Sequence, residues 1–519
     1  MSFPQSLNFT TTCGVLLSGL CAASLVRLVV KARSPLSSLP LPPGPRPLPI
    51  VGNVKDAPTS FEWLTFAAWG KTYGDVVHFH VFGKSVVVLN SLKAAKSVLE
   101  SQSAITSDRP RFAMISDLMG WSWALQFMSM GPRFRKYRKT VHRLLHAQAV
   151  RSYSPMIHEG SLALLNSLLE DPEHFQDHLK HHSGGLMMTI LYGEKAGSVR
   201  DQYVHNADKA IDGLVLAGNF GNYLVDFLPF LKYVPEWMPG AGFKQKARIW
   251  RQDARNMIEI PFRRTKQLLD GGSVVPSVMS KLVNEQVDSS GEITDEELIM
   301  GAIGVLYVGG GDTALSALTS FVLAMLLHPE AQARAQAEIS EVVGSQRLPD
   351  FSDRAALPYF ECIMLEVLRW NPAVPLGVPH RCMEDCNYNN YRIPAGATVL
   401  ANQWAILHDE DAYEDPLKFR PERFLDASKN DLAILDPREA SFGFGRRVCP
   451  GRHFADDLLW LLMIHIIASF EISPVRDADG RLVMPSGAYL TGLVTHPEPF
   501  KCTFTPRSTT LAQLIRSRN

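Results

Sequence analysis

Residues 441–455 read SFGFGRRVCPGRHFA, in which a single cysteine lies between a glycine-rich loop and a stretch with a helical pattern. A disulfide would need a second cysteine, and a zinc site would need three more ligands. The seven cysteines of the chain are scattered without any CxxC pair, an arrangement typical of a reducing compartment. The rest of the chain therefore has to indicate which partner the thiolate of Cys449 serves.

The chain has 519 residues, of which 46% are hydrophobic and 20% are charged, so it can bury a large core. Length alone would allow two or more domains. Lys+Arg and Asp+Glu both number 52, which gives a formal charge of zero. A protein that binds nucleic acid through a bulk basic surface is therefore not expected.

The N-terminal residues 1–33 are predicted to form a luminal tail and a transmembrane anchor. The stretch TTCGVLLSGLCAASLVRLVV, residues 11–30, is about the 20 residues long that a bilayer requires. No Lys or Arg precedes it, whereas Lys31 and Arg33 follow it, so the positive-inside rule places the main body in the cytosol. A cleaved signal peptide is the alternative, but it has the opposite charge polarity.

Two further features flank the predicted anchor. Asn8 begins an Asn-Phe-Thr sequon that would lie in the lumen as a possible glycosylation site, although it lies so near the membrane that non-use is expected. Residues 34–53 are rich in proline, which favours an extended hinge between the membrane and a main domain over residues 54–519.

The main domain is predicted to be one large domain, mainly α with a small β part. Residues 76–90, VVHFHVFGKSVVVLN, are typical of a β-hairpin around a glycine-containing turn. Helical patterns then dominate to about residue 345, and strand-like pieces return in the C-terminal third. Thr294 and Glu297 form a capping-box pattern that predicts the start of a long helix ending near His328, before Pro329.

The middle of this long helix carries GGGDT, residues 309–313. Each glycine inside a helix costs about 1 kcal/mol relative to alanine, so three in succession indicate a functional or strained site. Close helix packing on small residues is one interpretation. The other is that a flat group approaches the backbone, with Asp312 and Thr313 beside it.

Four motifs, taken together in their order along the chain, resemble those of a cytochrome P450, and the sequence around them is similar to that of fungal microsomal members. The motif FxxGxRxCxG is the most specific of them, and GGGDT resembles the oxygen-activation motif of the family's central helix. The resemblance covers essentially the whole chain. The other two motifs are ExxR, with Glu366 and Arg369, and FRPERF, with Arg423. The cysteine motif is matched by Phe442, Gly445, Arg447, Cys449 and Gly451.

The resemblance implies haem b as cofactor, with Cys449 as the axial thiolate ligand of the iron. The cysteine motif, with Phe442, Gly445 and Gly451, would bind the haem, and Pro450 would suit the first turn of the following helix. The family match assigns the two propionates to Arg447, Arg138 and His380. One departure is Phe134, which stands where the family has tryptophan, so one propionate hydrogen bond is lost.

The resemblance also assigns roles away from the thiolate. Asp312 and Thr313 would deliver protons to the oxygen species as general acid–base groups. A threonine hydrogen-bonded to its own helix backbone is the alternative for Thr313. Glu366, Arg369 and Arg423 would form a buried ion network with a structural role.

The function implied is a membrane-anchored haem-thiolate monooxygenase of the endoplasmic reticulum, in secondary metabolism or xenobiotic oxidation. Its electrons would come from NADPH-cytochrome P450 reductase, with cytochrome b5 as a possible second donor, and the basic helix at 133–143 would serve docking. The apolar segments 114–130, 372–378 and 487–494 would line the pocket for a terpenoid, aromatic or fatty-acyl substrate, and the aromatic loop 227–240 would face the membrane. A reductase-independent isomerase or dehydratase is the alternative, and a haem sensor is a remote one.

Overall fold

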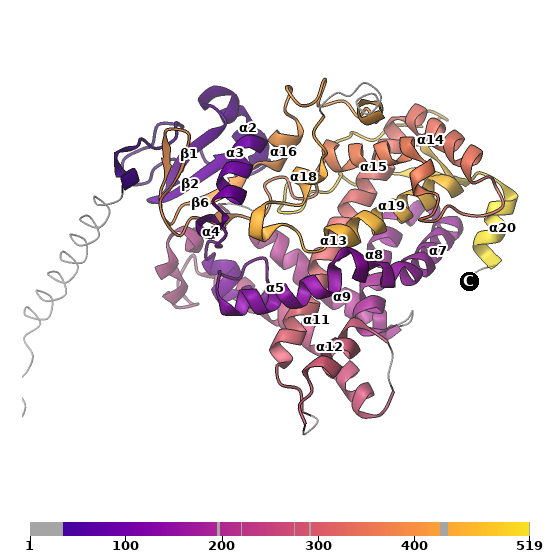
Figure 1. Ribbon diagram of the computed structural model, residues 1–519, viewed down its shortest axis with the longest axis horizontal. Coiled ribbons are helices and arrows are strands. Elements are labelled where there is room, and N and C mark those ends of the chain that lie inside the picture. The colour runs from indigo at the N-terminus through magenta and orange to yellow at the C-terminus, as the bar shows by residue number, and fades with distance from the viewer. Residues whose placement is uncertain are drawn as a thin grey trace, which may run out of the picture.

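Helix α13 (Glu296–Leu327) runs through the helical part of the molecule (Figure 1). The computed structural model describes residues 35–194, 198–218, 221–273, 276–289, 292–425 and 434–517. The predicted helix is confirmed, but its cap is one residue later than predicted. Asp295 accepts a hydrogen bond from the backbone N–H of Leu298 at 3.0 Å, whereas the Thr294 hydroxyl donates to the Gln286 carbonyl.

Within the described residues, α13 is the one helix long and apolar enough to cross a membrane. Of its most apolar window, 61% is buried inside the protein, as expected of a core helix. The anchor predicted at residues 11–30 and the sequon at Asn8 lie outside the described residues.

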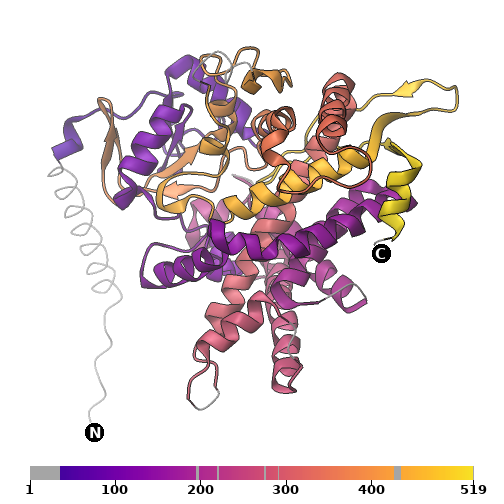
Figure 2. The same cartoon turned by 45° about the vertical axis from the view of Figure 1, so that its right-hand side comes forward.

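The other helices pack around α13, and α5, α8, α11, α15 and α19 all contact it. Figure 2 shows α11 and α12 extending away from the sheets. The longer helices are α2 (Glu62–Tyr73), α5 (Pro132–Leu145), α7 (Ser154–Glu170), α8 (Phe175–Tyr192), α9 (Ser198–Gly218), α11 (Gly242–Asp270), α12 (Val278–Gln286), α14 (Pro329–Val342), α15 (Pro358–Trp370), α19 (Arg452–Ser469) and α20 (Thr509–Ser517). The short ones are α3 (Leu92–Ala95), α4 (Ser103–Thr106), α6 (Ala147–Val150), α10 (Leu224–Phe227), α16 (Gln403–Leu407) and α18 (Arg438–Ser441).

Three small sheets complete the fold of the described residues. The largest has the strand order β1-β2-β6-β3, and its β1 and β2 form the predicted hairpin, paired antiparallel from Val76 opposite Leu89. The strands are β1 (Val76–Val81), β2 (Lys84–Leu89), β3 (His380–Arg381), β4 (Cys386–Tyr388), β5 (Tyr391–Ile393), β6 (Thr398–Ala401), β7 (Phe470–Arg476), β8 (Leu482–Val483) and β9 (Cys502–Pro506). The prediction of one mainly helical domain with a small β part is confirmed.

The proline-rich segment lies against the first sheet. The backbone N–H of His78 in β1 donates to the Pro43 carbonyl at 2.9 Å, and Gly52 bridges to Val81. A Cβ at Gly44 would lie 1.9 Å from the His78 carbonyl oxygen, so only glycine allows this approach. The Pro40 carbonyl also accepts the backbone N–H of Arg392 in β5 at 2.8 Å, so the segment contacts the folded body from residue 40 onward.

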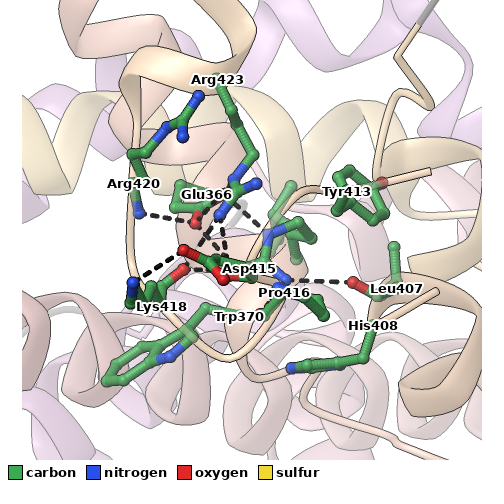
Figure 3. A network of polar contacts seen from close by, with 12 residues as sticks. Glu366, Trp370, Leu407, His408, Tyr413, Asp415, Pro416, Lys418, Arg420 and Arg423 are labelled. Carbon is green, nitrogen blue, oxygen red and sulfur yellow. Dashed lines mark hydrogen bonds and ion pairs between the residues drawn. The ribbon is translucent and has the colours of Figure 1, made fainter. Parts of the chain in front are cut away.

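A buried ion network fixes the loop that follows α16 (Figure 3). Arg369 binds the Glu366 carboxylate through two N–H···O bonds of 2.8 Å, and Arg423 reaches the same carboxylate at 3.2 Å. Glu366 also accepts the backbone N–H of Arg420 at 2.8 Å. The guanidinium groups donate further to the carbonyls of Leu407, Glu414, Pro416 and Lys418. The network thus joins α15 to residues 407–423.

Replacing Glu366 by alanine should strand two buried guanidinium groups, because the side chains of Glu366 and Arg369 are both 0% exposed. Breaking such a pair costs about 3–5 kcal/mol, so we expect Glu366→Ala to lose that much free energy of unfolding. Urea denaturation of the purified variant measures it.

Glu410→Ala is the matched control, because Glu410 pairs with Lys71 at 2.8 Å with both side chains at least 70% exposed. An exposed pair contributes about 0.2–1 kcal/mol. Equal losses in the two variants would contradict the role given to the network.

Candidate active site

A cavity of about 340 Å³ lies between α13 and the loop that carries Cys449. Its lining comes from segments far apart in the chain, including α5, α8, α9, α13, the segment 371–378 and the loop 441–451. Most of the lining is apolar, as in ligand-binding sites that exclude water. The chemistry of the site therefore depends on the few polar groups that reach the cavity.

Cys449 is held at this cavity by a tight loop. Its backbone N–H donates to the Phe442 carbonyl at 2.7 Å. Gly445 has φ +56°, and a Cβ there would lie 2.1 Å from the Leu99 carbonyl oxygen, so glycine is required on both counts. Helix α19 begins at Arg452 with Gly451 as its N-cap, so the prediction that Pro450 occupies its first turn is wrong by two positions.

The environment of Cys449 acts in two directions on its ionisation. Burial is the main cause and raises the pKa of the thiol, because a thiolate is poorly solvated there. The backbone N–H of Gly451 and the charges of Arg138 and Arg452 oppose this shift. A metal cation bound to sulfur would favour the thiolate outright.

Basic side chains gather at the cavity. Arg138 donates to the Val448 carbonyl at 2.7 Å, and the Nδ1 of His380 lies 3.0 Å from the Thr106 carbonyl. Arg447 donates to three backbone carbonyls, those of Ser107, Leu125 and Met128. Burial lowers the pKa of Arg447 to about 10 and that of His380 well below its usual value.

Arg109 belongs to the same group, although no motif in the sequence selects it. It donates to the carbonyls of Val378 and Pro379 at 2.5 and 2.7 Å. Its Nε is buried and has no hydrogen-bond partner among the described residues. Burial, together with the neighbouring charge of Arg447, lowers its pKa well below the usual value.

These cations fit a planar group that carries carboxylates. Asp108 is the carboxylate that counters them, and it is already bonded to the Met130 N–H and to Arg381. Buried charges without partners are costly, so the cations of this wall call for additional anions. We call Arg109, Arg138 and Arg447 the arginine wall. A haem would supply iron for the Cys449 thiolate and two propionates for the arginine wall.

Phe134 has a defined place beside this wall. The guanidinium carbon of Arg447 lies 3.8 Å from the centre of the Phe134 ring, within cation–π distance. The family's tryptophan N–H is absent, but the aromatic face is used to hold Arg447.

The opposite wall contains Asp312 and Thr313 of α13. The Thr313 hydroxyl donates to the Gly309 carbonyl at 2.6 Å, so the backbone-bonded alternative is the conformation found. The Nε2 of His496 lies 3.2 Å from the Oδ1 of Asp312, a distance that makes an ion pair when the imidazole is protonated.

The glycines of GGGDT divide between the two interpretations. A Cβ at Gly310 would lie 3.0 Å from the Met187 sulfur, as close packing requires, whereas at Gly309, which lines the cavity, it would meet nothing within 4 Å.

The structure brings most of the predicted site residues to one cavity. Those that line it are Arg138, Asp312, Thr313, His380, Phe442, Arg447, Cys449 and Gly451. Gly445 supports the loop from behind, and the network of Glu366, Arg369 and Arg423 lies outside the lining. Of the predicted pocket segments, residues 125–127, 372–374, 376–378 and 493–494 reach the cavity, and residues 114–124 do not. Arg109 and His496 are the polar residues that sequence reasoning missed.

Comparison with known proteins shows the family to which the chain belongs. A family model described as Cytochrome P450 matches residues 42–504. Cytochrome P450 monooxygenases 98 and 176 of Postia placenta are 42% and 40% identical over 484 and 479 residues, which cover 92% of this chain and 93% and 92% of theirs. The tryptamine 4-monooxygenase of Psilocybe cyanescens is 35% identical over 474 residues, 90% of this chain and 93% of its own. The chain therefore belongs to the cytochrome P450 family of oxidoreductases, whose members bind haem through a cysteine thiolate.

Proposed function

We propose that this protein is a monooxygenase that inserts one atom of O2 into an apolar small molecule, with electrons from NADPH supplied by a reductase. The observation that carries the proposal is a single apolar cavity lined by Cys449 on one side and by Asp312 and Thr313 on another. The apolar remainder of the lining favours a substrate with few polar groups.

In this proposal Cys449 ligates the haem iron, and Arg109, Arg138, Arg447 and His380 hold the propionates. The thiolate supplies electron density that favours O–O cleavage. Phe442 and Gly451 complete the pocket around the sulfur, and the positive φ of Gly445 sets the loop that carries it.

Thr313 and Asp312 would bind and deliver protons at the side of the cavity facing the thiolate. The Thr313 hydroxyl donates its proton to the Gly309 carbonyl, so its oxygen keeps lone pairs with which to accept a hydrogen bond. The Asp312 carboxylate adds the acid–base group that such a delivery requires.

The reductase would dock on α5. Arg135, Lys136 and Lys139 are exposed on it, although Lys136 also forms an ion pair with Asp295. Complementary charge mainly raises the association rate. Cytochrome b5, itself acidic, would use the same face.

The membrane anchor, the luminal Asn8 and residence in the endoplasmic reticulum belong to the same proposal. The loop predicted to face the membrane supports it, since Phe230, Tyr233 and Trp237 are 63%, 78% and 80% exposed. Aromatic side chains at this exposure suit the membrane interface.

The proposed reaction is tested with the full chain, reductase, NADPH, ¹⁸O2 and a panel of terpenoid, aromatic and fatty-acyl compounds. Indole-type amines belong in the panel because one relative is named for tryptamine. We expect a product that carries one ¹⁸O atom only when NADPH is present. An unlabelled, rearranged product without NADPH would instead indicate the isomerase reaction.

The arginine wall predicts that replacing Arg109 lowers haem retention, whereas replacing the nearby Arg111 does not. Arg109→Leu should retain less haem per chain, because Arg109 is buried and bonded at the cavity wall. Arg111→Leu is the control, since the side chain of Arg111 is 73% exposed. The haem-to-protein ratio after gel filtration measures both, and equal ratios would remove Arg109 from the propionate site.

The docking face predicts a salt-dependent effect. Arg135→Glu with Lys139→Glu should slow reduction of the haem by reductase about tenfold at low salt, and less at high salt because ions screen the charges. Lys71→Glu on α2 is the control. Stopped-flow reduction under CO measures the rates, and an unchanged rate at low salt would reject this face.

A further inference from the structure

Residues 489–496 are fastened to the face of α13 that carries Asp312. Asp312, Ser316 and Ser320 are spaced four residues apart, so they lie on one side of the helix. Each binds a different point of the segment. The contacts are Asp312 Oδ1 to His496 Nε2 at 3.2 Å, Ser316 Oγ donating to the Thr495 carbonyl at 2.5 Å, and Tyr489 Oη donating to Ser320 Oγ at 3.0 Å.

The backbone beside His496 is held from the other side as well. The N–H of Thr495 donates to the Ala373 carbonyl at 2.9 Å, and Thr495 is 4% exposed. The His496 carbonyl accepts the N–H of Leu490 at 2.8 Å, which closes the segment on itself. These hydrogen bonds hold the backbone of His496 in place. The fold therefore sets the position of the imidazole next to Asp312.

The pair connects the cavity with solvent. Asp312 lines the cavity next to Thr313, and its Oδ2 is buried without a partner among the described residues. The His496 side chain is 26% exposed, against 17% for Asp312, and it does not line the cavity. One end of the pair thus faces the site and the other end faces water.

Asp312 lies near other carboxylates, whose negative charge favours a cationic or proton-carrying partner for it. Asp208 on α9 lies close enough for its pKa to be raised by the charge of Asp312, although burial is the main cause of that shift. Lys180 lies 3.4 Å from Asp208 and opposes the shift, and Asp212 adds to it. His496 lies directly against Asp312, with 3.2 Å between Nε2 and Oδ1.

We propose that His496 is a positioning and proton-transfer residue that acts through Asp312, forming the solvent end of a path His496–Asp312–Thr313. Water protonates the imidazole at Nδ1, the Nε2 proton passes to Asp312 Oδ1, and proton exchange with water returns the ring to its Nε2–H form, so no oxidant or reductant is needed. The inference rests on the proposed function, because it assumes that Asp312 and Thr313 deliver protons during O2 reduction.

The test measures how O2 is reduced, which requires no identified substrate. One NADPH and one proton reduce O2 to hydrogen peroxide, whereas two NADPH and two protons reduce it to two molecules of water. Slower proton delivery should shift the outcome toward peroxide. The measurement is hydrogen peroxide released per NADPH oxidised, with full chain, reductase and O2.

Two substitutions separate transfer from positioning. His496→Gln keeps an N–H donor for Asp312 but cannot pass a proton on, and His496→Leu removes both. We expect the peroxide-to-water ratio to rise about tenfold in both, below the full 10²–10⁴ effect of a general acid because water can still reach Asp312. His328→Gln is the matched control, since His328 is 27% exposed and pairs with Glu330 at 3.3 Å. The reduced CO absorption band and the unfolding temperature should stay unchanged in all three.

The outcomes separate the two hypotheses. A wild-type ratio in His496→Gln with a raised ratio in His496→Leu would reduce His496 to a structural clamp and overturn the proton path. Unchanged ratios in both, alongside raised ratios in Thr313→Ala and Asp312→Asn, would overturn the role of His496 and leave the proposed function intact. Unchanged ratios in Thr313→Ala and Asp312→Asn would instead contradict the proposed function itself.

Discussion

A cysteine thiolate in an apolar cavity is the constraint on which the rest of this structure depends. Burial raises the pKa of Cys449, so the anion needs compensation from its surroundings. The Gly451 N–H and the charge of Arg138 provide part of it from the protein, and a metal cation bound to the sulfur would provide the rest. The tight loop with Gly445, which no other residue type could form so close to Leu99, presents the sulfur to the cavity.

The arginine wall follows from the same constraint. Arg109, Arg138 and Arg447 are brought together at the cavity, and burial is the main cause that lowers the pKa of each. Backbone carbonyls and the ring of Phe134 stabilise them in part. An anionic cofactor would complete the balance of charge.

Local patterns in the sequence predicted local structure well. The alternation around residue 83 predicted the hairpin of β1 and β2, and the long apolar helix ended at Pro329 as expected. Helix starts were wrong by one or two residues, because Asp295 competed with Thr294 as a cap and because Pro450 precedes the turn that begins at Arg452. Most of the predicted site residues came from the resemblance to a known family, in which the cysteine motif is the most specific match.

Arg109 and His496 could not be found in that way. Their roles come from neighbours more than 150 residues away, such as Val378 for Arg109 and Asp312 for His496. No periodicity or motif in the flanking sequence marks such a pairing, because it is created by the packing of α13 against a distant loop. Phe134 shows the reverse case, since the sequence revealed the missing indole but only the structure showed the arginine that stacks on the ring.

The bonds of Arg447 also bear on how the chain is made. Its guanidinium joins the carbonyls of Ser107, Leu125 and Met128 across separations of 319–340 residues. At roughly 5–20 residues per second of synthesis, about 20–70 s pass between the emergence of those carbonyls and that of Arg447. Throughout that interval the apolar walls formed by the N-terminal half lack the loop that closes them. The bonds that tie the cysteine loop to residues 107–128 can therefore form only after Arg447 has been synthesised.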